Sequence, residues 1–315
     1  MMSLTVGLLA RHTPNGPLGR SAALVDIAQD LLLGHLVDAG IFEHLVFKGG
    51  TALRKTYAGN AGRFSTDLDF SLLKAGEDPA VIQELLTDTI NGTSIDGFNY
   101  TVELRRERPT VVYETPFGSP GALTTKLDVG PPVWLDPVER PWVRLPVHKA
   151  YDIPDSIPVM TLEENIAEKV ARLNRLTPAR DVYDLVWVAT TSPHSQFDRA
   201  LVRRLAILKC WVDVHGLSAP SVSWVGPPGA SVLKPDGWLR TRTVKEFDDE
   251  SIGVLATPAP DLNKLAADMR SRFGFLGEPD AEDRRLLACG PADRSEVIAA
   301  IQALPGGRFT DVTLW

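Results

Sequence analysis

The sequence predicts an α/β (α+β) protein, in which a mixed sheet in the first half is followed by a mostly helical second half. Two observations support the sheet. An apolar strand at residues 44–47 runs directly into a glycine pair and a helix start, and alternating apolar and polar residues recur between 98 and 129. The third observation is the helical periodicity that dominates after residue 161. Because 315 residues exceed the usual size of a single core, we expect two domains, 1–160 and 161–315.

The first predicted elements are a packing helix, a strand and a second helix. Apolar residues recur at helical spacing over residues 19–40, where Gly40 would end the helix. The run HLVF predicts a short buried strand. Gly49 and Gly50 then predict a tight turn, and residues 51–57 open the next helix. The order of strand, glycines and helix start is one that can present main-chain N–H groups to an anion.

A second strand is predicted in STDLDFSLL, whose apolar residues share one face while Asp67 and Asp69 share the other. A helix is expected over residues 79–90. Three further strands are expected in NYTVELRRER, TVVYET and ALTTKLDV, with antiparallel pairing in part. The proline-rich segment 131–158 predicts irregular connections.

The second half predicts a series of helices. Thr161 and Glu164 have the spacing of a capping box for a helix that runs to about residue 176, and Thr177 and Pro178 start another. Further helices are predicted at 197–214, 260–273 and 295–304, with a loop rich in Pro, Gly and Ser between 216 and 237.

Composition excludes some classes of protein. A formal charge of −7 argues against a surface covered in positive charge for indiscriminate nucleic-acid binding, although a local basic groove remains compatible with it. The N-terminal apolar run LTVGLLA is too short to span a bilayer and has none of the features of a secretory signal. We therefore expect a cytoplasmic protein that does not contact membranes.

The acidic residues of the second strand predict a metal site. Asp67 and Asp69 are two apart, so their carboxylates stand on one face of a sheet, where like charges repel unless a cation lies between them. Mg²⁺ suits such oxygen ligands. Asp128 in KLDV lies on a strand that can pair with the first and supply a third ligand. The alternatives are a solvent-facing strand for the aspartate pair and a surface ion pair with Lys126 for Asp128.

Residues around the glycine pair predict a phosphate site. Gly49 and Gly50 allow close approach of the backbone to a phosphate, and Thr51 is suited to cap the helix or bind phosphate. The surrounding donors are predicted to contact a triphosphate, although each is also compatible with a solvated surface charge. They are Lys48, Arg54, Lys55, Arg63 and Ser65.

Four segments together resemble the AbiEii/AbiGii-type nucleotidyltransferase toxins, the group that includes the mycobacterial MenT toxins. They are FKGGTALRK, RFSTDLDFSL, LEENIAEKVARL and ARDVYDL, and the likeness covers about residues 45–188. It implies a DNA polymerase β-like nucleotidyltransferase core and a helical C-terminal domain that completes the active-site cleft. It further implies the toxin of a type IV toxin–antitoxin or phage-defence pair, which uses an NTP and Mg²⁺, with Mn²⁺ as an alternative.

The resemblance also implies roles for individual residues. By motif, Gly49, Gly50 and Thr51 fall at the phosphate turn, and Asp67 and Asp69 bind metal. The later helical motifs contain Lys169, which the resemblance places on the nucleotide, and Asp181, which it implies supports catalysis. Arg172 shares the polar face of the Lys169 helix and is predicted to contact the nucleotide as well. A salt-bridged pair of helices is the alternative reading of these charges.

The acceptor is less constrained than the site. In the MenT branch it is the 3′ end of tRNA, so we predict transfer of an NMP to RNA, inhibition of translation, and a cognate antitoxin encoded nearby. Three basic clusters are candidates for RNA contacts, at residues 105–108, 203–209 and 240–245. Two alternatives remain open, a nucleotidyltransferase that modifies a protein or small molecule and a non-catalytic protein that binds nucleotide or antitoxin.

Overall fold

The computed structural model describes residues 4–13, 19–118, 123–173, 178–215 and 260–308. The chain divides into two compact units. The sheet unit contains the described residues up to Val159 except Trp134–Asp136, and the helical unit contains those three residues and the described residues from Met160 onward. Within the described helices, none combines the length and apolar composition needed to cross a membrane.

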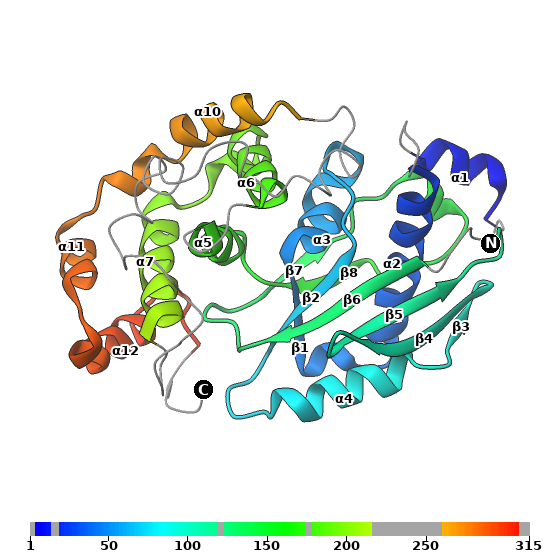
Figure 1. The fold of residues 1–315 in the computed structure, drawn as a ribbon, viewed down its shortest axis with the longest axis horizontal. Helices are drawn as coiled ribbons and strands as arrows, with labels where there is room; N and C mark the ends of the chain where they lie inside the picture. The colour runs from blue at the N-terminus through cyan, green and yellow to red at the C-terminus, as the bar shows by residue number, and fades with distance from the viewer. Residues whose placement is uncertain (1–3, 14–18, 119–122, 174–177, 216–259, 309–315) are drawn as a thin grey trace. The chain divides into compact units, whose positions relative to one another are not determined.

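The sheet unit is built on one mixed sheet with the strand order β3-β4-β5-β6-β2-β1-β8-β7 (Figure 1). The pairs β2–β6 and β1–β8 are parallel, and the remaining neighbours are antiparallel. The strands are β1 (Leu45–Lys48), β2 (Asp67–Leu72), β3 (Ser94–Ile95), β4 (Phe98–Arg105), β5 (Arg108–Glu114), β6 (Leu123–Gly130), β7 (Val138–Pro141) and β8 (Ser156–Val159). The predicted mixed sheet is confirmed.

Four α-helices belong to the described part of the sheet unit, and two of them cover one face of the sheet (Figure 1). They are α1 (Val6–His12), α2 (Gly19–Asp38), α3 (Gly49–Leu53) and α4 (Pro79–Ile90). The apolar side chains of α2 and α4 form one buried core with alternate residues of β2, including Leu68 and Phe70. Because alternate strand residues point to opposite faces, burial of this face leaves Asp67 and Asp69 on the other.

The helical unit contains six α-helices in its described part. They are α5 (Leu162–Leu173), α6 (Ala179–Thr190), α7 (Arg199–His215), α10 (Leu262–Arg272), α11 (Ala281–Ala288) and α12 (Arg294–Gln302). Thr161 Oγ1 accepts a hydrogen bond from Glu164 N at 3.3 Å, as the capping spacing predicts. The Glu164 carboxylate, however, accepts the main-chain N–H groups of Trp134 and Leu135 at 2.8 and 3.0 Å. It thereby fixes the 134–136 segment to the helices.

Two expectations about secondary structure are wrong. The proline-rich segment 131–158 contains β7 and, with Val159, β8, which pairs with the central strand β1. Pro141 lies at the end of β7, the edge strand, where a missing N–H is tolerated, and Pro158 lies inside β8 next to Val159, the residue of β8 that pairs with β1. Helix α11 was not expected. It follows its capping box at Asp280 with only eight residues, which is too short for a clear helical repeat of apolar residues.

A buried ion cluster stabilises the sheet unit beneath α3. It consists of Asp26 and Asp30 from α2 and of Arg54 and Lys55, which follow α3 directly, and all four are at most 4% exposed. Burial opposes ionisation of Asp26, yet Arg54 and Lys55 hold the pKa of its carboxyl well below the usual value. The prediction that Arg54 and Lys55 are phosphate donors is therefore wrong, because both cations are buried against aspartates.

The cluster predicts a loss of stability in acid. Since the pKa of Asp26 is lower in the folded than in the unfolded chain, its contribution is complete above the unfolded value of 3.8 and is lost as the pH falls toward the folded value. The urea concentration at the midpoint of unfolding is expected to drop between about pH 5 and pH 3. In Asp26→Asn this midpoint should drop less steeply. Asp155→Asn, which changes a fully exposed carboxylate, should follow the wild-type curve. Parallel curves for all three proteins would contradict this assignment.

Candidate active site

The centre of the sheet brings together the acidic residues that the alternation pattern selects. Strand β2 lies between β1 and β6, and its register sets Asp69 beside Lys48 on one side and beside Asp128 on the other. Asp67, on the same face of β2, lies opposite Lys126 of β6. Three carboxylates and two amines therefore share neighbouring positions on one face of the sheet.

The glycine turn contacts this face directly. Gly49 has φ of +79°, a conformation that costs L-residues free energy. A Cβ at this position would lie 3.1 Å from both Cβ and Cγ of Asp69, and closer still to its Oδ2. The Asp69 carboxylate thus packs against the main chain of the turn, in space that only a glycine leaves open. Gly50 follows in the first turn of α3, where helix N–H groups have no partner within the helix.

The Lys48 side chain extends across the sheet toward β6. A Cβ on Gly130 would lie 3.1 Å from Lys48 Nζ, although Lys48 and Gly130 lie on strands to either side of β2. The amine therefore passes over β2 next to the Asp69 and Asp128 positions. Sequence reasoning missed Gly130, and the only signal was a glycine two residues after Asp128 in KLDVG.

Thr51 connects the turn to the acidic strand. Its Oγ1 donates a hydrogen bond to the main-chain oxygen of Asp67. A threonine hydroxyl has one proton to donate, so in this arrangement the hydroxyl orients β2 and does not donate to a phosphate. The predicted contact between Thr51 and nucleotide consequently depends on its main-chain N–H and stays a prediction.

The three carboxylates fit a hard divalent cation by their donor chemistry, since Mg²⁺ takes carboxylate oxygens and keeps positions for water and phosphate oxygens. Their side chains do not converge as they stand. Among the residues that the structure describes, no three His, Cys, Asp or Glu side chains form a group able to hold an ion. Binding an ion therefore requires the carboxylates of Asp67, Asp69 and Asp128 to turn toward it, and this ligand set stays a prediction.

Arg63 and Ser65 lie in the segment that leads into β2, and both are buried. Arg63 Nη1 donates to the main-chain oxygen of Phe64 at 3.0 Å. Because both side chains are buried, the alternative that Arg63 and Ser65 are solvated surface residues is wrong. Their contacts with nucleotide stay a prediction.

In the helical unit, the charges of α5 and α6 form a buried ion group. Lys169 Nζ lies 3.0 Å from Asp181 Oδ1 and 2.9 Å from Asp184 Oδ2, and Arg172 Nη1 lies 3.4 Å from Asp181 Oδ2. Lys169, Asp181 and Asp184 are buried, whereas the Arg172 side chain is 42% exposed. Lys169 is thus bound by two carboxylates at once, which stabilises the pairing of α5 with α6.

Lys169→Met is expected to lower the free energy of unfolding by about 3–5 kcal/mol, because it leaves two buried carboxylates without their common counter-ion. Urea denaturation at neutral pH measures this. Lys264→Met is a matched control, since Lys264 pairs with Asp268 with 72% of its side chain exposed, and its effect should stay under about 1 kcal/mol. Equal midpoints for the two variants would contradict the assigned role of the buried group.

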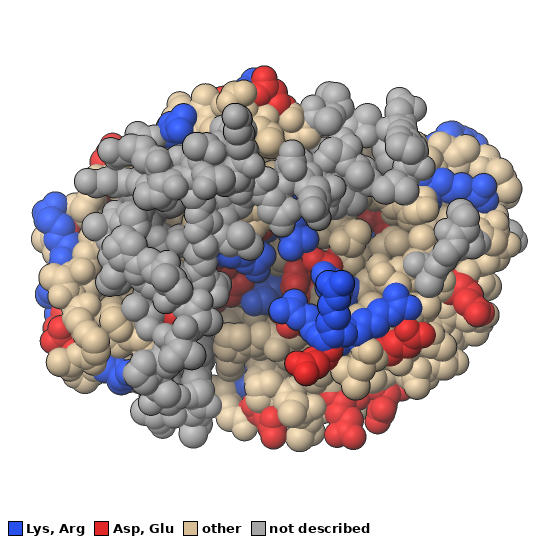
Figure 2. Space-filling view, viewed as in Figure 1, with Lys and Arg blue, Asp and Glu red and all other residues tan. Residues whose placement is uncertain are grey.

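The three predicted basic clusters differ in how far their side chains are exposed to solvent. Arg203 and Arg204 pair with Asp283, and Lys209, whose side chain is 10% exposed, pairs with Glu164 at 2.9 Å, so carboxylates already engage these cations of α7 and their contact with RNA stays a prediction. The cluster at 240–245 lies outside the described residues. At 105–108, three arginines are exposed where β4 turns into β5, and one of them, Arg105, pairs with Glu103 at 2.8 Å. Figure 2 shows Lys and Arg side chains gathered with acidic ones over this part of the sheet.

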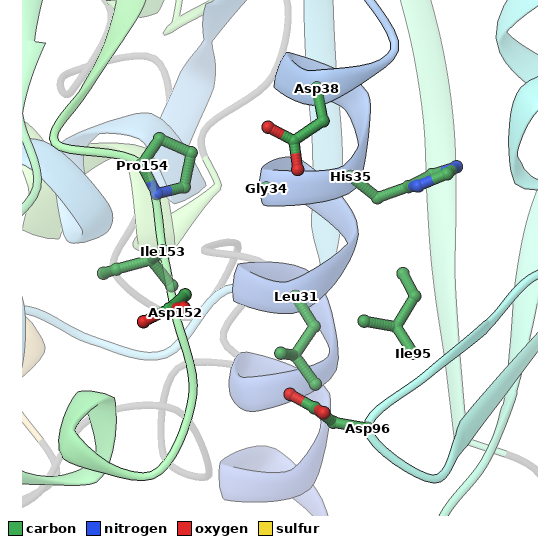
Figure 3. A pocket seen from close by; sticks show the side chains of 9 residues that line it. All are labelled: Leu31, Gly34, His35, Asp38, Ile95, Asp96, Asp152, Ile153 and Pro154. Atoms are coloured by element: carbon green, nitrogen blue, oxygen red, sulfur yellow. The ribbon is translucent and has the colours of Figure 1, made fainter. Parts of the chain in front are cut away.

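A separate cavity of about 390 Å³ lies in the sheet unit along α2. Figure 3 shows residues 152–154 on one side of the helix and Ile95 and Asp96 on the other. Three aspartates line the cavity together with His35, and none of the predicted site residues does. Because clustered carboxylates repel a polyphosphate, this cavity does not suit an NTP.

Comparison with known proteins identifies a matching family and similar solved structures. The profile of a family described as "Nucleotidyl transferase AbiEii toxin, Type IV TA system" matches residues 30–279. Among solved structures, the chain is similar to MenT4, a nucleotidyltransferase toxin from Mycobacterium tuberculosis H37Rv, with 35% sequence identity and a TM-score of 0.82. That match covers 96% of this chain and 99% of the other. No curated protein matches the sequence.

Proposed function

Since the chain belongs to the AbiEii nucleotidyltransferase toxin family, we propose that it transfers an NMP from an NTP to a hydroxyl at the 3′ end of tRNA and thereby inhibits translation. That it is a nucleotidyltransferase toxin of a type IV system, with an antitoxin as partner, follows from the family. Enzymes of this family use a divalent metal ion and an NTP. The proposal concerns the acceptor, the identity of the metal and the residues that act.

One observation carries the proposed chemistry, namely the contact of the glycine turn with the acidic strand. Gly49 leaves room for the Asp69 carboxylate, and the register of β2 and β6 sets Asp128 beside it. A phosphate bound by the N–H groups of the turn would therefore lie close to these carboxylates. Lys48 adds a positive charge over the same strands, which favours an anionic substrate.

We assign Asp67, Asp69 and Asp128 to Mg²⁺, with Mn²⁺ as an alternative. When bound, the metal would neutralise the charge that develops on the pyrophosphate leaving group and lower the pKa of the attacking hydroxyl. The turn and Lys48 would orient the triphosphate. A titration of activity with each metal separates the two ions.

The assignment of Lys169 and Arg172 to nucleotide and of Asp181 to catalysis also remains a proposal. A charge-balanced variant tests Lys169: Lys169→Met combined with Asp184→Asn removes one charge of each sign and leaves Asp181 with Arg172. If Lys169 contacts nucleotide, this variant should recover stability relative to Lys169→Met and still lack activity. Recovery of both properties would assign Lys169 to structure alone.

The proposed RNA acceptor is supported by the exposed arginines of the β4–β5 turn. By strand register, Arg105 and Arg108 lie on the same face of the sheet as Asp67 and Lys126. Positive charge beside a metal site can bind the phosphates of an RNA strand. A cytoplasmic location is part of the proposal, since tRNA and NTPs would both be available there.

The experiment is to incubate the protein with each of the four α-labelled NTPs, with Mg²⁺ and total tRNA, and to separate RNA from protein after nuclease or protease treatment. The expected result is label on tRNA from one preferred NTP, removed by nuclease. Absence of label on RNA with all four NTPs would refute the proposed acceptor. Label that resists nuclease and is removed by protease would assign the activity to a protein acceptor.

A further inference from the structure

The segment between the glycine turn and the acidic strand has an unusual local structure. Helix α3 ends after five residues at Leu53, and the chain continues as a π-helical turn, Arg54–Ala58. Such turns are rare and cost hydrogen-bond geometry, so they persist where the surrounding structure requires them. Here the turn sets two consecutive side chains, Arg54 and Lys55, against the same acidic residue of α2, although neighbouring residues of a regular α-helix do not face one another.

The contacts of this buried ion cluster are short and numerous. Arg54 Nε and Nη2 lie 2.7 and 2.8 Å from the two carboxylate oxygens of Asp26. Lys55 Nζ lies 2.6 Å from Asp26 Oδ1, 2.7 Å from the main-chain oxygen of Asp26 and 2.7 Å from Asp30 Oδ1. Both ends of the Arg54 fork and all three donors of Lys55 are thus engaged.

Further groups hold the two aspartates in place. His12 Nε2 lies 2.8 Å from Asp26, while His148 Nε2 and the Tyr151 hydroxyl each lie 3.1 Å from Asp30. Desolvation offsets much of the attraction within a buried ion pair, so the net gain in stability is smaller than the number of contacts suggests. In this network the short contacts also hold Arg54 and Lys55 in one geometry.

Arg54 also contacts the chain on its way to the acidic strand. Its Nη1 donates to the main-chain oxygens of Gly59 and Gly62 at 2.9 and 3.2 Å, and its guanidinium carbon lies 3.8 Å from the centre of the Phe64 ring. Asp67 follows three residues after Phe64. One side chain therefore connects α2, the end of α3 and the loop that leads into β2.

We propose that Arg54, fixed by Asp26 and supported by Lys55, is a positioning residue for nucleotidyl transfer: it sets the loop 59–64 so that Asp67 and Asp69 stand at the correct distance from the Gly49 turn. The inference rests on the proposed use of that turn and those aspartates in the reaction. Arg54 is buried and carries out this role through the backbone, without contact with substrate. The hydrogen bond from Thr51 to Asp67 is the second connection between the same two segments.

Arg54→Lys tests the proposal, because lysine keeps the positive charge at Asp26 and lacks the planar fork that reaches Gly59 and Gly62 at the same time. Arg144→Lys is the matched control: Arg144 binds the main-chain oxygens of Ile153 and Pro154 and the Asp155 carboxylate, in the same kind of arrangement on a different loop. Phe64→Leu is a milder second variant, which leaves the ion pair intact and removes the ring contact.

Two measurements are made on each variant. Hydrogen exchange of segments 45–53 and 59–70 reports on positioning whether or not the acceptor is known. Kinetics with the wild-type substrates report kcat, KM for the NTP and the metal concentration at half-maximal rate.

For Arg54→Lys we expect faster exchange in segment 59–70, kcat lower by about 10–100-fold, KM within about twofold and a higher metal requirement. Phe64→Leu should change in the same direction by a smaller factor, and Arg144→Lys should match the wild type.

The proposal is overturned if exchange of segment 59–70 is unchanged in Arg54→Lys and Phe64→Leu, or if exchange rises while kcat stays at the wild-type value. A rise in KM alone also overturns it, since that result would assign Arg54 to substrate binding. If Arg54→Lys does not fold, Phe64→Leu decides by the same criteria. Failure of the proposed function is recognised separately, as absence of nucleotidyl transfer by the wild type, and the exchange data then still decide whether Arg54 positions the loop.

Discussion

Asp69→Asn is expected to reduce nucleotidyl transfer by roughly 10³-fold in kcat, about 4 kcal/mol of transition-state stabilisation. The substitution keeps the shape of the side chain and removes the charge that a divalent cation requires at this position. Asp69 is the residue of β2 that packs against the Gly49 turn and lies beside Asp128 of β6 in the strand register. Transfer of labelled NMP and release of pyrophosphate, at saturating metal and NTP, measure the effect.

The control for Asp69→Asn is Glu114→Gln on β5. Glu114 lies four residues along β5 from Thr110, the register partner of Lys126, so it is a carboxylate on the same face of the sheet at a distance from the turn. Its side chain is exposed, and removal of its charge should change kcat by less than about twofold. If Asp69→Asn retains more than a tenth of the wild-type rate, Asp69 is not a metal ligand in the reaction.

Gly49→Ala is expected to lower both stability and activity. Its φ of +79° costs alanine about 1–2 kcal/mol, and the added methyl group would overlap the Asp69 carboxylate, so that either the turn or the carboxylate must move. Displacement of a reacting group by about 1 Å can cost on the order of 10²-fold in rate. Urea denaturation and the labelled-NMP assay measure the two effects separately.

Gly92→Ala separates backbone strain from the clash. Gly92 has φ of +80°, and a Cβ there would meet nothing within 4 Å. Both variants should therefore lose a similar amount of stability from the backbone conformation, whereas only Gly49→Ala should lose activity. Full activity in Gly49→Ala would show that the contact between the turn and Asp69 is not needed for the reaction.

The sequence predicted well those elements whose signals are local. The Gly-Gly turn after β1, the alternation in β2 and the helix over Pro79–Ile90 depend on neighbouring residues, and each is confirmed. β7 and β8 were missed because their prolines argue against strands, while their pairing with each other and with β1 is decided by residues far away in sequence. That residues 1–160 and 161–315 form two separate domains remains a prediction.

In the site, residue types were easier to predict than partners. Alternation placed Asp67 and Asp69 on one face, and the expectation that the Asp128 strand pairs with theirs is confirmed by the β2–β6 register. Sequence did not show that Arg54 and Lys55 turn inward to Asp26, because a π-helical turn has no local pattern and both acidic partners lie in a distant helix. It also did not show that the Thr51 hydroxyl is already engaged.

The parallel pairing of β2 with β6 has a consequence for the synthesis of the protein. Parallel neighbours require a long connection, and here it contains α4 and the strands β3 to β5. Asp69 and Asp128 therefore become neighbours late, after a large loop has closed at an entropic cost that makes such contacts slow to form. If Asp128 acts as proposed, a nascent chain that already exposes the glycine turn and both β2 aspartates is still incomplete, and we expect no nucleotidyl transfer before β6, at the earliest, has left the ribosome and joined the sheet.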